Sequence, residues 1–402
     1  MEFTRRRTLV AALAGMAAFP AVRAQKRYGP GVTDTSITIG STAPFSGPVS
    51  ILGTLGKTAQ AYVSKVNAEG GINGRSIKLI QYDDGYNPGK ALEMTRKLVE
   101  QDQVLFVYQT VGTSVNNAVQ RYLEPKKIPQ LLIMSGANKW SDAKAAPMVV
   151  PGMPSYSVEG RVYARWVLEH MPKARIAVLM QNDDFGRDYL AGIQQGLGAR
   201  GKEMIVAQST YETTDASVDS QIVSLKGRGA DVFFSLSNGK YTVQSLRKAH
   251  DIGWKPQVFL PLGSSSPTAI MRPAGPEKVV GAITAAYGKS AADPQWKDDK
   301  GILDLRAFAG KWMGGADPND TLVSGGHASA VILMKILAQC GDDLTRENVM
   351  RQALSLRDFS TPTTLPGIRI NTSDSSHAVY TQLWLQRFDG NNWSPFGGAV
   401  AL

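Results

Sequence analysis

The chain has 402 residues, of which 43% are hydrophobic and 19% charged, and this composition and length favour a globular protein of two or three domains. After the first 24 residues, its basic residues are scattered singly among acidic ones without a stripe of interleaved aromatics, so the net charge of +10 does not indicate nucleic-acid binding. The four histidines lack the spacing of metal ligands, and the one cysteine, Cys340, lies in an apolar helical run and cannot form an internal disulfide. We therefore expect no metal and no cofactor.

Residues 1–24 have the three parts of a secretory signal. The basic start Arg5-Arg6-Arg7 leads into an apolar stretch of about 11 residues, and small residues precede Ala24. Since a membrane-spanning helix needs about 20 residues, this stretch predicts a signal peptide that is cleaved near Ala24, and hence a periplasmic protein. The paired arginines resemble a twin-arginine signal, although Thr8 and Val10 depart from its usual residues, so general secretion stays an alternative route.

Short β runs alternate with helical runs along the rest of the chain, and this pattern predicts parallel α/β sheets. A first series has expected strands at 37–40, 77–80, 104–108 and 129–134, with helices at 55–66, 89–100 and 115–122. A second series after Pro151 has expected strands at 175–180, 204–208, 231–236 and 257–261, with helices at 158–170, 186–197, 218–226 and 243–250. The last third adds an apolar helix at 326–339 and a closing hairpin that turns at 389–392. Two series of one kind predict two lobes of the same class.

No catalytic constellation is apparent. The segment 53–58 is similar to the end of a phosphate-binding loop but lacks the first glycine, and no Gly-x-Ser-x-Gly elbow precedes a helix. Asp83-Asp84 and Asp183-Asp184 each stand between a strand and a helix, where acidic residues commonly cap helix N-termini, and we interpret both pairs as caps. We therefore expect that the protein is not an enzyme, with an exported hydrolase as the least favoured function class.

Several strands end in small hydroxylic and glycine residues directly before a helix. These are Ser46-Gly47, Gly112-Thr113-Ser114 and Ser135-Gly136-Ala137. In open α/β sheets, ligands bind beyond the carboxyl ends of the strands. Free backbone N–H groups at a helix start, with hydroxyls beside them, can hold an anion without a permanent ion pair. These loops predict a site for a carboxylate, with plain turns and caps as the structural alternative.

The spacing of five motifs resembles that of a known family. The motifs are 43–48 (Ala-Pro-Phe-Ser-Gly-Pro), 67–74 (Asn-Ala-Glu-Gly-Gly-Ile-Asn-Gly), 82–84 (Tyr-Asp-Asp), Gly112-Thr113 and 182–186 (Asn-Asp-Asp-Phe-Gly). They are similar to those of the leucine/isoleucine/valine-binding-protein-like receptors of ABC importers, and the resemblance covers essentially the whole mature chain. It implies the type I periplasmic binding fold, in which two Rossmann-like lobes are joined by three hinge crossings. We place the crossings near Pro151, Tyr287 and Phe359, so that lobe 1 is 25–151 plus 287–358 and lobe 2 is 152–286 plus 359–402.

The resemblance also implies where the ligand binds. It places the carboxylate-holding loop at Gly112, Thr113 and Ser114, and a second loop of the same lobe at Ser135, Gly136 and Ala137. In the opposite lobe it assigns the covering aromatic to Phe185, and the loop after strand 231–236 adds Ser237 and Asn238. With Ser46, Gly263 and Ser264 these residues form the predicted site.

One departure from the family concerns the ligand. The acidic residue that neutralises an amino acid's ammonium should follow strand 257–261, but Leu262-Gly263-Ser264-Ser265-Ser266 contains no carboxylate. A buried ammonium without a charge partner costs several kcal/mol, so either another acidic residue reaches the site or the ligand has no amino group. Aromatic or aliphatic carboxylates, keto acids and small amides then compete with branched-chain and aromatic amino acids.

The resemblance therefore implies a monomeric binding protein that captures a small carboxylate-bearing metabolite by closing its cleft. The protein would deliver this ligand to an inner-membrane ABC permease. A periplasmic sensor subunit of the same fold and a small-amide receptor are the alternatives. A neighbouring permease gene would favour transport and a neighbouring kinase gene would favour sensing.

Overall fold

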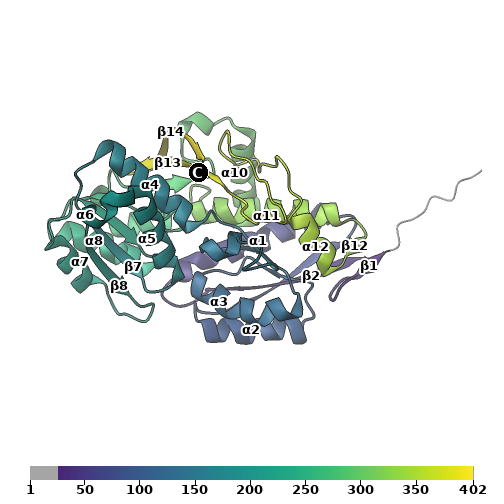
Figure 1. Cartoon of the computed structure of the whole chain (residues 1–402). Coiled ribbons are helices and arrows are strands. Elements are labelled where there is room, and N and C mark those ends of the chain that lie inside the picture. Colours follow the sequence, from purple (N-terminus) through teal and green to yellow (C-terminus); the bar gives the residue numbers. More distant parts are fainter. Residues whose placement is uncertain (1–25, 402) are drawn as a thin grey trace, which may run out of the picture.

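The computed structural model describes residues 26–401, so the predicted signal peptide at 1–24 lies outside the described residues. The strands of this part of the chain form two large sheets and one small parallel ladder, in which β1 (Arg27–Tyr28) pairs with β12 (Asp343–Leu344). Helices cover both large sheets, and Figure 1 shows the two resulting bodies side by side, with helices α4 to α8 on the left and α1 to α3 at the centre and lower centre. We call the body around the five-stranded sheet lobe 1 and the body around the seven-stranded sheet lobe 2.

Lobe 1 confirms the first predicted series. Its parallel sheet has the order β3-β2-β4-β5-β6. The strands are β2 (Ser36–Ala43), β3 (Ser76–Asp83), β4 (Val107–Tyr108), β5 (Gln130–Ile133) and β6 (Val149–Pro151), and the helices are α1 (Gly53–Ala68), α2 (Pro88–Glu100), α3 (Thr113–Leu123), α10 (Lys300–Trp312), α11 (Thr321–Cys340) and α12 (Arg346–Ala353). Local chemistry explains several boundaries. Helix α2, for example, begins where the Asn87 side chain accepts the Lys90 N–H and a proline fills the first helical position.

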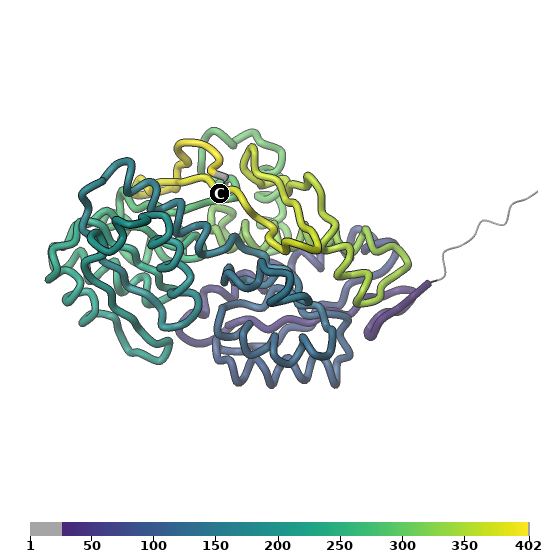
Figure 2. Tube along the Cα trace, viewed as in Figure 1, coloured from purple at the N-terminus to yellow at the C-terminus, as the bar shows by residue number. Residues whose placement is uncertain are grey.

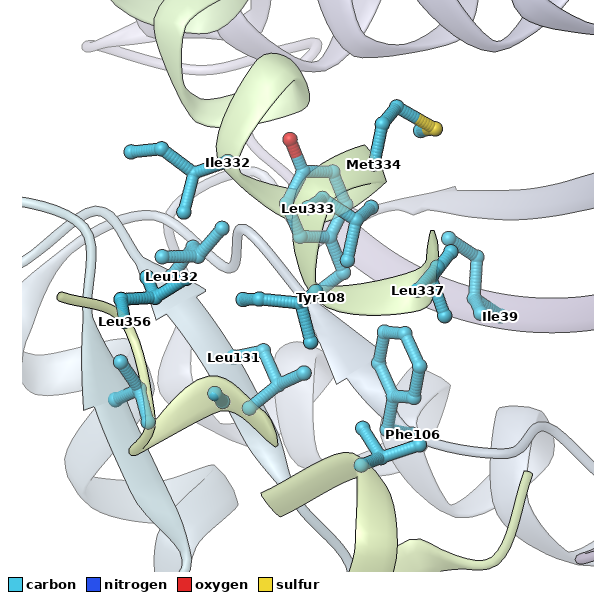
Figure 3. Close-up of a cluster of buried hydrophobic side chains, with 14 of the residues drawn as sticks. Ile39, Phe106, Tyr108, Leu131, Leu132, Ile332, Leu333, Met334, Leu337 and Leu356 are labelled. Atoms are coloured by element: carbon cyan, nitrogen blue, oxygen red, sulfur yellow. The ribbon is translucent and has the colours of Figure 1, made fainter. Parts of the chain in front are cut away.

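The core of lobe 1 lies between its sheet and α11. Figure 3 shows Ile332, Leu333 and Leu337 of α11 among side chains of β2, β4 and β5, all of them buried. The buried Tyr108 hydroxyl forms a hydrogen bond there with the Ser329 hydroxyl, at 3.1 Å. By length and mean hydropathy α11 could cross a membrane, but 67% of its most apolar window is buried within the protein. Its apolar surface is therefore explained by the core of lobe 1.

Lobe 2 confirms the second predicted series and the closing hairpin. Its sheet has the order β14-β13-β11-β10-β9-β7-β8, in which β13 runs antiparallel to both its neighbours. The strands are β7 (Ile176–Gln181), β8 (Ile205–Tyr211), β9 (Val232–Leu236), β10 (Gln257–Phe259), β11 (Ile283–Ala286), β13 (Gln382–Phe388) and β14 (Trp393–Ala401), and the helices are α4 (Tyr156–His170), α5 (Asp184–Leu197), α6 (Gly201–Met204), α7 (Asp219–Lys226), α8 (Lys240–Asp251) and α9 (Arg272–Ala274). Every residue of β9 is buried, as expected for a central parallel strand that helices cover on both faces.

The chain passes between the lobes after β6, after β11 and before β13. Side-chain packing suggests a different position for the third crossing, which the sequence placed near Phe359. Leu365, Ile368 and Ile370 belong to the same buried cluster as Ile39 of lobe 1. Figure 2 shows the chain after α11 in yellow-green, running back from the far end of lobe 1 toward the hairpin. We propose to assign residues 359–380 to lobe 1 and to place the third crossing near residue 381, while the other two predicted crossings stay as proposed.

Candidate functional site

A pocket lies between the two lobes, with a volume of about 1200 Å³ that includes the part open to solvent. Loops that follow the carboxyl ends of parallel strands supply much of its wall, as is usual for ligand sites in open α/β sheets. These loops contribute Tyr86 after β3, Val111 and Gly112 after β4, Met134 after β5, Phe185 after β7, Asn238 after β9, and Leu262 and Gly263 after β10. Leu55 of α1 and Leu322 of α11 add apolar surface from lobe 1.

Aromatic side chains form one continuous wall of the pocket. Tyr156, at the start of α4, stacks on Tyr189 with ring centroids 4.7 Å apart, and meets Phe185 edge-on at 5.1 Å. All three side chains are buried and line the pocket. Such a wall suits a planar ring or an alkyl chain, because aromatic surface gains most from excluding water. Phe185 is part of this wall, and its predicted role of covering a ligand stays a prediction.

The predicted carboxylate loop lies at the edge of the pocket. Helix α3 begins at Thr113 without a side-chain cap, so the N–H groups of its first turn have no partner within the helix. Gly112 lines the pocket with φ of +99°, and a Cβ there would stand 2.3 Å from the ring of Tyr86. The Thr113 hydroxyl is buried, 2.8 Å from the Ser135 hydroxyl. The Gly112 N–H donates to the Met134 carbonyl at 3.0 Å, so the free backbone donors of this loop are the Thr113 and Ser114 N–H groups, and the Thr113 hydroxyl is engaged with Ser135.

The second predicted loop of lobe 1 lies behind the pocket wall. Ser135 accepts the Trp140 indole N–H at 3.0 Å, and Gly136 is packed so tightly that a Cβ would lie 2.0 Å from the Pro154 carbonyl. Ala137 is buried beside them and belongs to a hydrophobic cluster that also contains side chains of α4 and α5. None of these three residues lines the pocket. Their role in this structure is to support the wall that Tyr156 forms.

Four of the twelve predicted site residues line the pocket: Gly112, Phe185, Asn238 and Gly263. The others, Ser46, Thr113, Ser114, Ser135, Gly136, Ala137, Ser237 and Ser264, do not. Ser46 is exposed and donates to Asp83 at 2.6 Å, while the buried Ser264 donates to the Ser237 carbonyl at 2.6 Å and thereby holds the base of the Asn238 loop. A direct contact between the four lining residues and a ligand stays a prediction.

Tyr86 is a pocket residue that the sequence did not predict. It is buried with φ of +62°, an unusual conformation for a bulky side chain, and the preceding residue Gly85 has φ of +57°. Asp84 holds this turn because its carboxylate accepts the Tyr86 N–H at 2.8 Å, and Asp83 accepts the Gly85 N–H at 3.0 Å. The interpretation of Asp83-Asp84 as helix caps is therefore wrong, since Asn87 caps α2. The corresponding interpretation of Asp183 is confirmed, since it caps α5 by accepting the Phe185 N–H.

No acidic side chain is among the residues that line the pocket within the described part of the chain. One acid directly behind the wall is Glu159 of α4, which is fully buried. Its carboxyl accepts the Leu262 N–H at 2.8 Å and the Tyr189 O–H at 2.7 Å, so it fixes two lining elements instead of facing the ligand. Burial raises the pKa of the Glu159 carboxyl to about 7. Between residues 26 and 401, no group of three or more His, Cys, Asp or Glu side chains is placed to hold a metal.

Hydrogen bonds join the two lobes beside the pocket. Asn117 of α3 donates to Asp184 of α5 at 3.0 Å, and the Asn138 N–H donates to Asp188 of α5 at 2.7 Å. On the other side, Ser266 donates to Asp320 at 2.8 Å. Each of these bonds joins one lobe to the other. The structure therefore shows the cleft closed over the pocket.

Comparisons with known proteins agree with this geometry. The sequence profile of a family described as periplasmic binding protein matches residues 36–392. The "Leu/Ile/Val-binding protein homolog 7" of Brucella suis is 26% identical over 249 residues, and this alignment covers 58% of this chain and 61% of that protein. The match thus spans about three fifths of the length of such curated relatives.

Two solved structures are similar over almost the whole chain. A branched-chain amino acid ABC transporter structure from Thermus thermophilus with bound valine has a TM-score of 0.82 at 16% identity, covering 92% of this chain and 98% of that one. An ABC transporter solute-binding protein from R. palustris in complex with benzoate has a TM-score of 0.76 at 19% identity, covering 91% and 98%. At these identities the likeness concerns the fold, and it confirms the predicted class of two parallel-sheet lobes.

Proposed function

The chain belongs to the periplasmic binding protein family, and on that premise we propose that it captures a small carboxylate without an amino group and delivers it to an ABC permease. Family membership confirms the predicted class, a solute-binding receptor of the periplasm and not an enzyme. The ligand and its delivery to a permease are our proposal.

The observation that carries the proposal is the absence of any acidic side chain among the described residues that line the pocket. An α-ammonium group inside a closed, largely apolar pocket needs a carboxylate partner, because an unpaired buried charge costs several kcal/mol. The buried acids Glu159 and Asp320 lie next to lining residues, and both oxygens of each already accept hydrogen bonds from protein groups. A ligand without an ammonium group avoids this penalty.

The same pocket offers a carboxylate something to bind. The uncapped start of α3 supplies backbone N–H groups and the positive end of the helix dipole. Next to it, where the Tyr156 hydroxyl lies 3.4 Å from the Thr113 hydroxyl, the rings of Tyr156, Phe185 and Tyr189 supply an apolar wall for the body of the ligand. Neutral dipoles hold an anion less tightly than a buried cation would, and this favours release to a permease.

Closure would couple capture to delivery. A ligand that touches both lobes favours the closed form of a hinge equilibrium by its difference in affinity for the two forms. Gly112 lines the pocket from lobe 1, and Phe185 and Asn238 line it from lobe 2. A ligand held between them would stabilise the bonds between the lobes, such as Asn117 to Asp184. We propose that this closed surface is the form that a permease recognises.

The test is a thermal-unfolding screen of the mature protein with matched pairs of ligands. The pairs are leucine with 4-methylpentanoate and 4-methyl-2-oxopentanoate, and phenylalanine with 3-phenylpropanoate, with benzoate added. A ligand present at about 100 times its dissociation constant adds about 2.7 kcal/mol to the free energy of unfolding, which raises the midpoint measurably. We expect the acids without an amino group to raise the midpoint and the amino acids to leave it unchanged. A shift with the amino acids alone contradicts the proposal.

A charge introduced at Gly263 sharpens the test. A Cβ at this position meets only Met153 Cε, at 3.4 Å, so a side chain can be accommodated. We expect Gly263→Asp to weaken binding of the deaminated acids by repulsion and to allow the amino acids to bind. Gly263→Asn, which has the same shape without the charge, is the matched control and should not gain amino-acid binding.

A further inference from the structure

A cluster of polar side chains lines the pocket where the chain passes between the lobes. Lys289 follows β11, and Thr361, Thr363 and Thr364 lie in the segment before β13. The two segments are held together because the Lys289 N–H donates to the Thr363 carbonyl at 2.7 Å. We call these four side chains the threonine subsite. None of them belongs to the predicted carboxylate loops.

The three threonine hydroxyls of this subsite have more O–H donors than there are contacts between them. Thr361 Oγ1 lies 2.9 Å from Thr364 Oγ1 and 3.3 Å from Thr363 Oγ1, and all three residues are at most 7% exposed. Thr364 Oγ1 also accepts the Thr361 N–H at 3.0 Å. Among the described residues, the three hydroxyl protons therefore share two hydroxyl–hydroxyl contacts. Each contact uses one proton, so at least one O–H has no acceptor within the cluster.

Lys289 is the charged member of the subsite. Its Nζ lies 2.6 Å from Asp299 Oδ2 and 3.2 Å from the Pro362 carbonyl, and its side chain is 11% exposed. An ammonium group has three protons; these two contacts use two of them, and Nζ also lies 5.2 Å from the centroid of the Trp296 ring. Since a buried O–H without an acceptor costs free energy, the threonine hydroxyls favour a ligand that brings an acceptor atom.

Charge decides which acceptor fits. Lys289 is the charged side chain among the described residues that line the pocket, and Asp299 already balances it. A carboxylate placed here would be a buried negative charge near Asp299 without the helix N-terminus that α3 offers beside Gly112, whereas a hydroxyl or carbonyl oxygen accepts hydrogen bonds without adding charge.

We propose that the threonine subsite binds an uncharged oxygen of the ligand, so that the ligand is a carboxylic acid with a second, remote hydroxyl or keto group. This inference rests on the proposed function, since it adds a second polar contact to a ligand whose carboxylate binds elsewhere in the pocket. It names a substrate class, hydroxy- and oxo-substituted acids, instead of the unsubstituted acids.

The experiment is isothermal titration calorimetry of the mature protein with two series of probes. The series are hexanoate, 6-hydroxyhexanoate and hexanedioate, and benzoate, 4-hydroxybenzoate and benzene-1,4-dicarboxylate. We expect the hydroxy acid of at least one series to bind about fivefold more tightly than its parent acid, as one or two net hydrogen bonds provide. The diacids should bind more weakly than the hydroxy acids.

Two variants assign the effect to the subsite. Thr363→Val removes a hydroxyl whose one contact is 3.3 Å long, and it should abolish the preference for the hydroxy acid while leaving the parent acid's affinity within about twofold. Thr95→Val is the control, because Thr95 is also buried and has an unpaired hydroxyl but does not line the pocket. Should Thr363→Val fail to fold, the double variant Lys289→Met with Asp299→Asn removes the ion pair as a unit and should reduce the same preference.

The outcomes separate the two proposals. Parent acids that bind as tightly as the hydroxy acids, diacids that bind best, or a Thr363→Val variant that keeps the preference would each overturn the subsite while the proposed function stands. If no acid of either series binds and only amino acids do, the proposed function fails and the subsite inference fails with it.

Discussion

Glu159 makes the stability of this protein depend on pH in a way that one substitution should remove. The carboxyl is fully buried, and burial raises its pKa from an ordinary 4.5 to about 7. Below pH 4.5 it is protonated in both the folded and the unfolded chain. As the pH rises from 4.5 to 7, the unfolded chain ionises first, so the unfolded state is favoured and the free energy of unfolding falls.

The magnitude follows from the two pKa values. A difference of one pKa unit between the folded and unfolded states corresponds to about 1.36 kcal/mol. Glu159 should therefore lower the free energy of unfolding by about 2.5 kcal/mol between pH 5 and pH 8. Glu159→Gln keeps the shape and an oxygen that can accept the Leu262 N–H, but it cannot ionise. Altered contacts with the tyrosines change the stability by an amount that does not depend on pH, so the quantity to compare is the change with pH and not the absolute value.

The assay is urea unfolding of wild type and Glu159→Gln at pH 5 and pH 8. Burial also raises the pKa of Asp84, to about 6, but this group is present in both proteins and cancels in the comparison. Glu169→Gln, an exposed position on the same helix, is the control and should behave as the wild type. The same loss of stability with pH in wild type and Glu159→Gln would refute the assignment of an ionising buried carboxyl at Glu159.

Two further predictions concern single positions. Gly112→Ala should lower the free energy of unfolding by about 2 kcal/mol and abolish ligand binding, because the residue has φ of +99° and a Cβ would overlap the Tyr86 ring. Urea unfolding measures the first effect and calorimetry the second, and a stable variant that binds normally would contradict the geometry. Cys340 should not react with an aromatic disulfide reagent at pH 8 in the folded protein, because the thiol is buried and its pKa is raised to about 12. It should react fully in guanidinium chloride. Rapid labelling of the native protein would show that α11 is more accessible than the structure indicates.

Much of the fold was predictable because its signals are local. The N-cap of α5 at Asp183 and the turn of the β13–β14 hairpin, where Asp389 accepts the Asn391 and Asn392 N–H groups at 2.7 Å, follow from neighbouring residues alone. The buried run of β9 likewise identifies a central strand. The strand expected at 104–108 is shorter in the structure, where β4 spans Val107–Tyr108, although the Leu105 N–H still donates to the Thr38 carbonyl of β2 at 2.9 Å. The length of a strand depends on how its neighbours pair with it and not on the segment itself.

The candidate site was predicted less completely. Phe185, Asn238 and Gly263 line the pocket because strand ends point toward it in this topology. Ser135 does not, because its hydroxyl is turned into lobe 1 to meet Thr113 and Trp140. A sequence pattern places a residue at a strand end, but it does not tell on which side of the loop the side chain lies.

The sequence by itself determined the alternation of strands and helices, the class of two α/β lobes and the lack of an acidic residue in the loop after β10. Each of these depends on periodicity or on residue identity along one segment. Tertiary structure alone decided that Tyr86 covers Gly112, that Glu159 holds the Leu262 loop from behind the pocket wall and that Lys289 meets Thr363. Those contacts join residues 26 to 103 positions apart, and their geometry is set by how separate elements pack, which no local pattern encodes.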